Sequence, residues 1–376
     1  MVEWQNFTDE RFYYEVDGWK TLSKFRALEK ANGNASKIKF YCYDDVFSKL
    51  DWARPKLGWS ELLRIRCHQL RNSYNHLCLW FSGGWDSTTV LQAFIDNDVK
   101  LDELIIFRRT FTDDVEIQDA IEFANQVKQL KWNDLEIKYV EFDHQHHTQI
   151  YLAMGDQWID SPGSNFMFPK LHRHFIHHKL DGGLKVKSYR GERGEIEAHD
   201  KPKIYLHDNK WYCMIPDSSM VMYFGADVDL FYLNDQLPEL HVSQVHLSID
   251  YFENLFRCER KVDHRLPHLV QGYDPSTIYR YFADWNRSIG RVCTNNQSAI
   301  HGYSKLRARS QGPNDEEGKK LISYVQQTDD LSYRIYTEGL NNIKIATGYD
   351  LWQDPLPTIL SKSYYVRDLA PDLHRV

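Results

Sequence analysis

A turn of small residues between an apolar run and a helix-compatible segment is the part of this sequence best suited to chemistry. Residues 77–91 read LCLWFSGGWDSTTVL. Gly83 and Gly84 let the backbone turn sharply and approach a ligand, because neither residue has a Cβ atom. The first turn of the following helix offers free N–H groups and the positive end of its dipole to an anion. Three hydroxyl donors can add to such a site: Ser82, Ser87 and Thr88.

The same turn carries a carboxylate, Asp86. Alone, this charge would repel a phosphate group, so a magnesium ion between carboxylate and phosphate is implied. A Walker-type phosphate loop is excluded, because the pattern GxxxxGK[ST] does not occur in the sequence. The structural alternative for this segment is a Gly-Gly turn that joins a buried strand to a helix and binds nothing.

The motif SGGWDS at residues 82–87, set between a predicted strand and a predicted helix, resembles the SGGxDS signature of the N-type ATP pyrophosphatases. This PP-loop superfamily includes the synthetase domain of asparagine synthetase, 7-cyano-7-deazaguanine synthase and NAD synthetase. The resemblance covers residues 76–235, and the overall layout is similar to PP-loop proteins carried by phages. It implies an α/β fold with a parallel sheet, of the adenine nucleotide alpha hydrolase-like type.

The resemblance also implies a reaction and its cofactors, ATP and Mg²⁺. A substrate oxygen attacks the α-phosphate of ATP, pyrophosphate leaves into the loop, and a nitrogen or sulfur nucleophile traps the adenylated intermediate. Asp86 would then be both catalytic and a metal ligand. The residues expected to bind ATP from this loop are Ser82, Gly83, Gly84, Asp86, Ser87 and Thr88.

Two further segments gain a role from the resemblance. Phe107 and Arg108 end the second predicted strand, where the backbone of the superfamily commonly meets the adenine edge of ATP. Residues 188–195, SYRGERGE, resemble the second signature of the superfamily, in which charged residues follow a strand and face the phosphates. There Arg190 and Arg193 would neutralise the polyphosphate as catalytic residues, and Glu195 would share the metal. Solvated arginines and a charged surface loop are the alternatives.

Other chemistry-bearing residues favour structural interpretations. Residues 225–229, GADVD, resemble a GADE stretch of asparagine synthetase but lack its glutamate. His174 and His178 are one helical turn apart within a histidine-rich stretch, yet a solvated helix face explains this spacing better than a metal site. The six cysteines include no CxxC pair, and we predict that Cys42, Cys78 and Cys213, which lie in apolar runs, are small buried hydrophobes.

The loop needs a strand before it and a helix after it, and the flanking sequence supplies an alternating series. Strands are predicted at 77–81, 103–107 and 137–142, with helices at 87–95 and 113–130 between them. Strands that alternate with helices of this length indicate a parallel sheet covered on both faces. A fourth strand of the same sheet is predicted at 184–189.

The rest of the chain divides into two flanking regions. Residues 1–75 are predicted as an N-terminal α/β extension, with helices at 19–31 and 60–75, the second capped by Ser60, and a strand at 38–43. Residues 76–235 form the predicted PP-loop domain, which also holds a hairpin at 203–215. Residues 236–376 are predicted as a mostly helical C-terminal region, with helices at 242–256 and 276–289.

The charge and the apolar content of the sequence limit the classes of partner that we expect. The formal net charge is −7 and no basic stripe stands out, so nucleic acid is not indicated, although a local basic cleft would favour a nucleotide- or nucleic-acid-modifying enzyme. No apolar stretch approaches the ~18 residues of a membrane span, and the N-terminus does not resemble a signal peptide, so a cytoplasmic protein is predicted. The sequence does not indicate an oligomeric state.

These observations lead to one principal hypothesis. The chain would adenylate a substrate oxygen at the expense of ATP, release AMP and pyrophosphate, and then form an amide or amidine. Ammonia or a small amine is the expected nucleophile, because Val2 rules out the N-terminal nucleophilic cysteine of a glutaminase domain. A non-catalytic nucleotide-binding protein is the other alternative.

Overall fold

The structure is a computed structural model of the whole chain. It describes residues 11–109, 115–142, 193–198, 202–217, 228–263, 330–350 and 359–373, with a few single positions between 323 and 357. The histidine-rich stretch and the elements predicted at 184–189 and 276–289 lie outside the described residues.

A five-stranded sheet forms the centre of the region around the loop. Its strand order is β10-β7-β4-β5-β6, and every neighbouring pair is parallel. The predicted α/β class with a parallel sheet is therefore confirmed. The strands are β4 (His76–Trp80), β5 (Glu103–Arg109), β6 (Glu136–Phe142), β7 (Arg193–Glu197) and β10 (Val228–Leu230).

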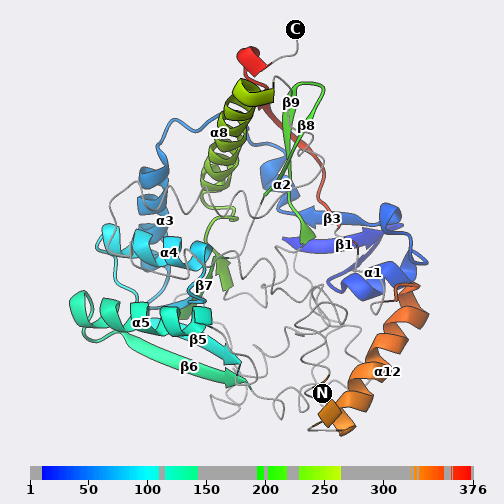
Figure 1. The fold of residues 1–376 in the computed structure, drawn as a ribbon, viewed down its shortest axis with the longest axis horizontal. Coiled ribbons are helices and arrows are strands. Elements are labelled where there is room, and N and C mark those ends of the chain that lie inside the picture. Colours follow the sequence, from blue (N-terminus) through cyan, green and yellow to red (C-terminus); the bar gives the residue numbers. More distant parts are fainter. Residues whose placement is uncertain are drawn as a thin grey trace.

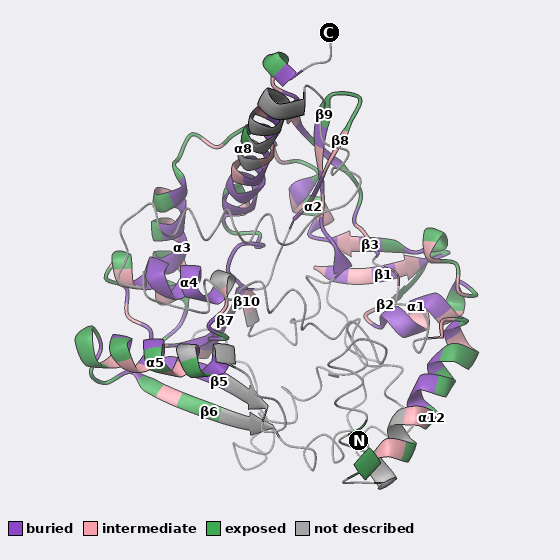
Figure 2. Ribbon diagram, viewed as in Figure 1, coloured by how far each residue is buried: buried purple, intermediate pink, exposed green. Residues whose placement is uncertain are grey.

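One face of this sheet is apolar and is covered by helices. Strand side chains alternate between the two faces, so Leu77, Leu79, Leu104 and Ile106 point to the same side and are buried there. They join one hydrophobic cluster with residues of the helices α3 (Trp59–Ser73), α4 (Trp85–Asp96) and α5 (Val115–Leu130). Figure 1 shows α5 lying along β5 and β6, and in Figure 2 α4 is buried over much of its length.

The opposite face of the same strands is polar at its amino end. It carries His76 and Cys78 of β4, Glu103 of β5, and Arg193 and Glu195 of β7. Among the described side chains of β4 and β5, the apolar residues buried there form a small cluster, Cys78, Trp80 and Ile105. A parallel sheet usually has apolar residues on both faces, so this face departs from the common pattern.

Two antiparallel sheets of three strands share a second hydrophobic core. One has the order β2-β1-β3 and the other the order β11-β9-β8. Helix α8 (Pro238–Asp263) packs in the same core through Val242, Val245 and Ile249. The strands are β1 (Phe12–Val16), β2 (Trp19–Thr21), β3 (Lys39–Cys42), β8 (Lys203–His207), β9 (Lys210–Met214) and β11 (Tyr364–Asp368).

Short helices and one long helix complete the described chain. They are α1 (Lys24–Lys30), η2 (Ala35–Lys37), α2 (Asp44–Phe47), α12 (Asp330–Thr347) and η6 (Pro371–Leu373). Helix α12 lies against α1 at one side of the molecule (Figure 1). No helix in the described ranges is long and apolar enough to cross a membrane.

Two local predictions are wrong. The helix predicted from residue 19 begins at Lys24, because β2 precedes it and the hydroxyl of Ser23 accepts a hydrogen bond from the Arg26 N–H (3.2 Å). Helix α3 is capped by Gly58 rather than Ser60. Strand β7 pairs with β4, and the fourth strand predicted at 184–189 lies outside the described residues and stays a prediction.

The predicted hairpin at 203–215 is confirmed as β8 and β9. Asp208 and Asn209 form its two-residue turn with positive φ angles of 48° and 58°, which Asp and Asn tolerate better than most residues. The division at residues 75 and 235 stays a prediction. It does not coincide with the two cores, since the second core takes residues from all three ranges.

Candidate functional site

The SGGWDS loop leaves the carboxyl end of the central strand. The N–H of Phe81 donates to the Ile105 carbonyl (2.9 Å), which keeps the chain on the sheet up to the loop. Gly83 then takes a φ of 70°, a left-handed conformation that favours glycine. Gly84 is the N-cap of α4 and, lacking a side chain, makes no side-chain capping bond. The positive end of a 12-residue helix is thus aimed at the loop.

The hydroxyls of the loop are arranged around this helix end. The Ser82 and Ser87 Oγ atoms are 3.1 Å apart, and the Gly84 N–H donates to Ser82 Oγ at 3.3 Å. Thr88 Oγ1 donates to the Gly83 carbonyl at 3.3 Å. Ser82 is exposed whereas Ser87 and Thr88 are buried, so Ser82 is the hydroxyl best placed to meet a ligand from solvent.

The other predicted loop contacts are placed by their backbone. Asp86 is the second residue of α4, and Phe107 and Arg108 lie in the last three residues of β5. Strand β5 runs parallel to β4, so the loop and the end of β5 lie at the same edge of the sheet. Ligands of open α/β sheets bind at this carboxyl edge. The structure therefore brings the backbones of these residues to one edge.

The second predicted signature is placed differently from the expectation. Arg190 lies outside the described residues, and Arg193 and Glu195 lie within β7 rather than after a strand. Arg193 is in register with His76, the first residue of β4, which puts it at the amino end of the sheet. Six residues separate His76 from Ser82, about 20 Å along an extended chain. The structure does not bring Arg193 to the loop.

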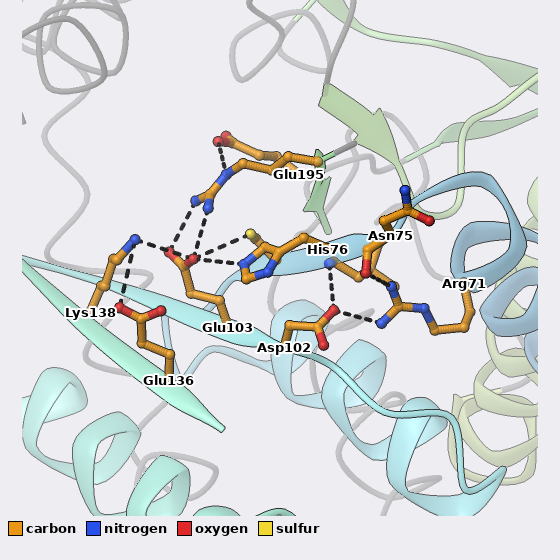
Figure 3. Close-up of polar contacts among 11 residues, drawn as sticks. Arg71, Asn75, His76, Asp102, Glu103, Glu136, Lys138 and Glu195 are labelled. Atoms are coloured by element: carbon orange, nitrogen blue, oxygen red, sulfur yellow. Dashed lines mark hydrogen bonds and ion pairs between the residues drawn. The ribbon is translucent and has the colours of Figure 1, made fainter. Parts of the chain in front are cut away.

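Arg193 instead takes part in a cluster around one carboxylate, which we call the Glu103 cluster: His76, Cys78, Glu103, Lys138 and Arg193. Glu103 is fully buried, and Arg193 donates to both of its oxygens at 2.9 and 3.0 Å. His76 Nε2 is 3.1 Å, Lys138 Nζ 3.3 Å and Cys78 Sγ 3.6 Å from Glu103 Oε2. Figure 3 shows His76 and Lys138 pointing toward Glu103.

The cluster sets the charge of its members. Burial alone would raise the pKa of Glu103, but the hydrogen bonds and charge of Arg193, with His76 and Lys138, lower the pKa below the ordinary value. Burial raises the pKa of the Cys78 thiol, a shift that Glu103 reinforces and Arg193 opposes. Glu103 is thus an anion and Cys78 a neutral thiol at neutral pH.

Glu195 links the Glu103 cluster to the strand that leads into the loop. Its carboxylate accepts a hydrogen bond from the Trp80 indole (2.8 Å) and lies 3.6 Å from Arg193 Nε. Trp80 is the last residue of β4. The carboxylate predicted to share a metal with the loop is therefore held on the polar face of the sheet, one strand away from β4.

Sequence reasoning missed the Glu103 cluster. Its members come from four strands and lie far apart in the chain, so only the parallel register brings them together. The sequence did contain one indication of this cluster. A strand that is buried on both faces is expected to be apolar throughout, yet β4, β5 and β7 begin with the polar residues His76, Glu103 and Arg193.

Two other sequence candidates receive structural roles. Asp229, in the stretch compared with GADE, accepts a hydrogen bond from the Tyr74 hydroxyl and lies 3.5 Å from the guanidinium of the fully buried Arg66. Cys42, Cys78 and Cys213 are buried, as predicted, and so is Cys67.

Comparisons with known proteins give a weak structural likeness. No family model and no curated protein sequence matches the chain. The NMN synthetase of Francisella tularensis is 11% identical with a TM-score of 0.29, over 74% of this chain and 97% of that chain. The NH3-dependent NAD synthetase of Campylobacter jejuni is 14% identical with a TM-score of 0.27, over 63% of this chain and 98% of that chain. TM-scores this low assign neither a family nor an activity.

Proposed function

We propose that the chain is an AMP-forming ligase of the PP-loop type, which cleaves ATP to AMP and pyrophosphate. One observation supports this more than any other. The SGGWDS loop joins the carboxyl end of a parallel strand to the N-terminus of a helix, with Gly83 in the left-handed conformation and Ser82 exposed. A glycine turn of this kind is suited to a polyphosphate, because backbone N–H groups and a helix dipole both favour negative charge there.

In this proposal each loop residue has a role toward ATP. The N–H groups around Gly83 and Gly84, with the hydroxyl of Ser82, bind the departing pyrophosphate. Ser87 and Thr88 hold the turn in shape, since their hydroxyls donate to the Gly84 carbonyl (3.2 Å) and the Gly83 carbonyl (3.3 Å). Asp86 binds Mg²⁺, whose charge makes the carboxylate compatible with the phosphates.

The remaining ATP contacts come from the same edge of the sheet. The backbone of Phe107 and Arg108 at the end of β5 is proposed to meet the adenine. Arg190 stays a proposed phosphate ligand. Arg193 and Glu195, in contrast, are proposed to act through the polar face of the sheet, since they lie within β7.

The second substrate is proposed to be a small molecule with a carboxylate, amide or carbonyl-like oxygen. This oxygen attacks the α-phosphate and pyrophosphate leaves with the electron pair of the broken P–O bond. Ammonia or an amine then attacks the activated carbon and displaces AMP, which yields an amide or amidine. The N–H groups of the loop would stabilise the charge on the leaving pyrophosphate, and the Mg²⁺ that Asp86 would hold would supply positive charge there.

Calorimetric titration with Mg-ATP tests the binding half of the proposal. Gly84→Val introduces a branched side chain at the N-cap beside the phosphates, and Ser82→Ala removes the exposed hydroxyl. We expect both changes to abolish or strongly weaken ATP binding. Ser73→Ala serves as the matched control, because the Ser73 hydroxyl belongs to an exposed residue and donates to the Gln69 carbonyl within α3. Unchanged affinity in both loop variants would contradict the proposal.

A further inference from the structure

Three side chains with different ligand chemistries meet at the amino end of the parallel sheet. His76 and Cys78 point to the same face of β4 because they are two residues apart, and Glu103 opposes Cys78 in the register of β4 with β5. Their imidazole, thiol and carboxylate ligand atoms all lie within 4.8 Å of one another. We propose that they bind a divalent transition-metal ion of the zinc type, at a site separate from the Mg²⁺ site of the loop.

The distances between the ligand atoms fit such an ion without rearrangement of the strands. Zinc takes nitrogen, sulfur and oxygen ligands at about 2.0–2.3 Å, so neighbouring ligands of a tetrahedral site lie about 3.3–3.8 Å apart. His76 Nε2 and Cys78 Sγ are 3.1 and 3.6 Å from Glu103 Oε2. Three protein ligands leave a fourth position for water or another small ligand, as in open zinc sites.

The two cations beside Glu103 do not prevent metal binding, because each has a second carboxylate. Arg193 Nε lies 3.6 Å from Glu195, and Lys138 Nζ lies 3.8 Å from Glu136. A divalent ion is then neutralised by the Glu103 carboxylate and the Cys78 thiolate. Binding converts the thiol to a thiolate and releases one proton to solvent.

Arg193 supplies the outer support that a metal-binding carboxylate needs. Its guanidinium donates to both Glu103 oxygens, so one of these bonds can remain on Oε1 while Oε2 turns to the ion. Entry is provided by His76, whose side chain is 38% exposed, whereas Cys78 and Glu103 are fully buried. Two cations compete with the ion for Oε2: Arg193, which keeps its second bond on Oε1, and Lys138, at 3.3 Å.

Cobalt is the probe for this site, because Co²⁺ replaces zinc and its thiolate complexes absorb in the near ultraviolet. The full chain, freed of metal by a chelator and kept anaerobic, is titrated with Co²⁺. We expect a thiolate-to-cobalt charge-transfer band that saturates at one ion per chain. Excess Zn²⁺ should abolish the band.

Substitutions test whether the cobalt band comes from this site rather than from other side chains that could bind cobalt. Cys78→Ser should abolish the band, and Cys213→Ser, a change at another fully buried strand cysteine, should leave it intact. His76→Gln, at a partly exposed position, should weaken cobalt binding at least about 100-fold, more than loss of an outer-shell partner. Lys138→Gln should tighten binding about two- to fivefold, because it removes the weak ion pair of a half-exposed lysine with Glu103.

The tightening by Lys138→Gln is a readout that a purely structural cluster would not give. Absence of a charge-transfer band in the wild-type chain would overturn the proposal, as would a band that survives Cys78→Ser. Equal cobalt affinity of His76→Gln and the wild type would overturn it too. None of these results depends on ATP turnover, so they leave the proposed function of the loop unaffected.

Discussion

The two faces of the parallel sheet differ although the same strands build both. Toward α3, α4 and α5 the strands present Leu77, Leu79 and Leu104, which are fully buried in one hydrophobic cluster. Toward the other side they present the Glu103 cluster, where a fully buried carboxylate is held by a guanidinium, an ammonium and an imidazole. The first face stabilises the fold, and the second keeps polar groups in a geometry that can bind a ligand.

The difference between the two faces indicates that the polar face is the better candidate for a functional site. Apolar burial explains the first face completely, whereas buried charged groups cost free energy unless they are paired. Such groups gather at functional sites more often than elsewhere. The second core also contains a buried titratable group, His241. Among the described residues, its ring nitrogens have no hydrogen-bond partner.

The largest expected effect is on the apolar face. Leu79→Ala removes a fully buried side chain between the sheet and its helices. We expect unfolding free energy to fall by about 2–5 kcal/mol, through lost burial and the cavity that remains. Urea unfolding measures this loss. A loss below 1 kcal/mol would show that the helix-covered face is not the main source of stability in this region.

His241 and Glu103 are both buried titratable groups, but only Glu103 has hydrogen-bond partners of opposite charge. Burial lowers the pKa of His241 from 6.5 to about 3. His241 therefore binds a proton more readily in the unfolded chain than in the folded chain. The free energy of unfolding decreases as the pH is lowered from about 6.5 to about 3. The total loss of unfolding free energy is on the order of 3–4 kcal/mol. This is less than the full pKa shift of His241 would give, because local opening of the structure lets the ring bind a proton without global unfolding.

Stability against pH in His241→Leu checks this expectation. The variant keeps an apolar side chain against Phe47 and Trp52, so its stability should depend less on pH between 6.5 and 3. His207→Gln is the control, since His207 is exposed and its substitution should leave the profile unchanged. Identical slopes in His241→Leu and the wild type would contradict the assignment.

Asp86→Asn tests the loop, with an effect on rate rather than on stability. The amide keeps the size of the carboxylate but binds Mg²⁺ poorly, so we expect a rate loss of at least about 100-fold, near 2.7 kcal/mol in transition-state stabilisation. The melting temperature without ligand should stay near that of the wild type, because a first-turn acid contributes only about 0.3–1 kcal/mol. Higher Mg²⁺ should recover part of the rate. Unfolding of the variant would return Asp86 to a structural role.

Glu103→Gln is the smallest of these effects and concerns the polar face. The change leaves Arg193 and Lys138 without their shared anion. Because these two side chains are 35% and 44% exposed, we expect a loss of about 1–3 kcal/mol, below that of a fully buried pair. The double variant Glu103→Gln with Lys138→Gln should lose less than the sum of its single variants. Strict additivity in urea unfolding would show that the cluster is not coupled.

The sequence was informative where apolar patterns were strong. The strands at 77–81, 103–107 and 137–142, the helix after the loop and the hairpin at 203–215 all appear close to their expected bounds. Local patterns could not identify β7, because the sequence RGEIE has one apolar residue, Ile196, and the partners of Arg193 on β5 and of Glu195 on β4 are far away in the chain.

The site divides in the same way. The loop could be predicted because its strand, turn and helix are contiguous in the chain. The placement of Arg193 could not, since it depends on the register of β7 with β4. The Glu103 cluster also required the register of β4 with β5 and of β5 with β6, which no short pattern contains.

The products of ATP turnover test the central proposal most directly. The chain is incubated with Mg-ATP, ammonia and a panel of small carboxylate substrates, and the nucleotides are separated by chromatography. A loop that holds the leaving pyrophosphate predicts AMP and pyrophosphate in equal amounts, and their loss in Asp86→Asn. ADP and inorganic phosphate as the only products would contradict the proposed role of the SGGWDS loop.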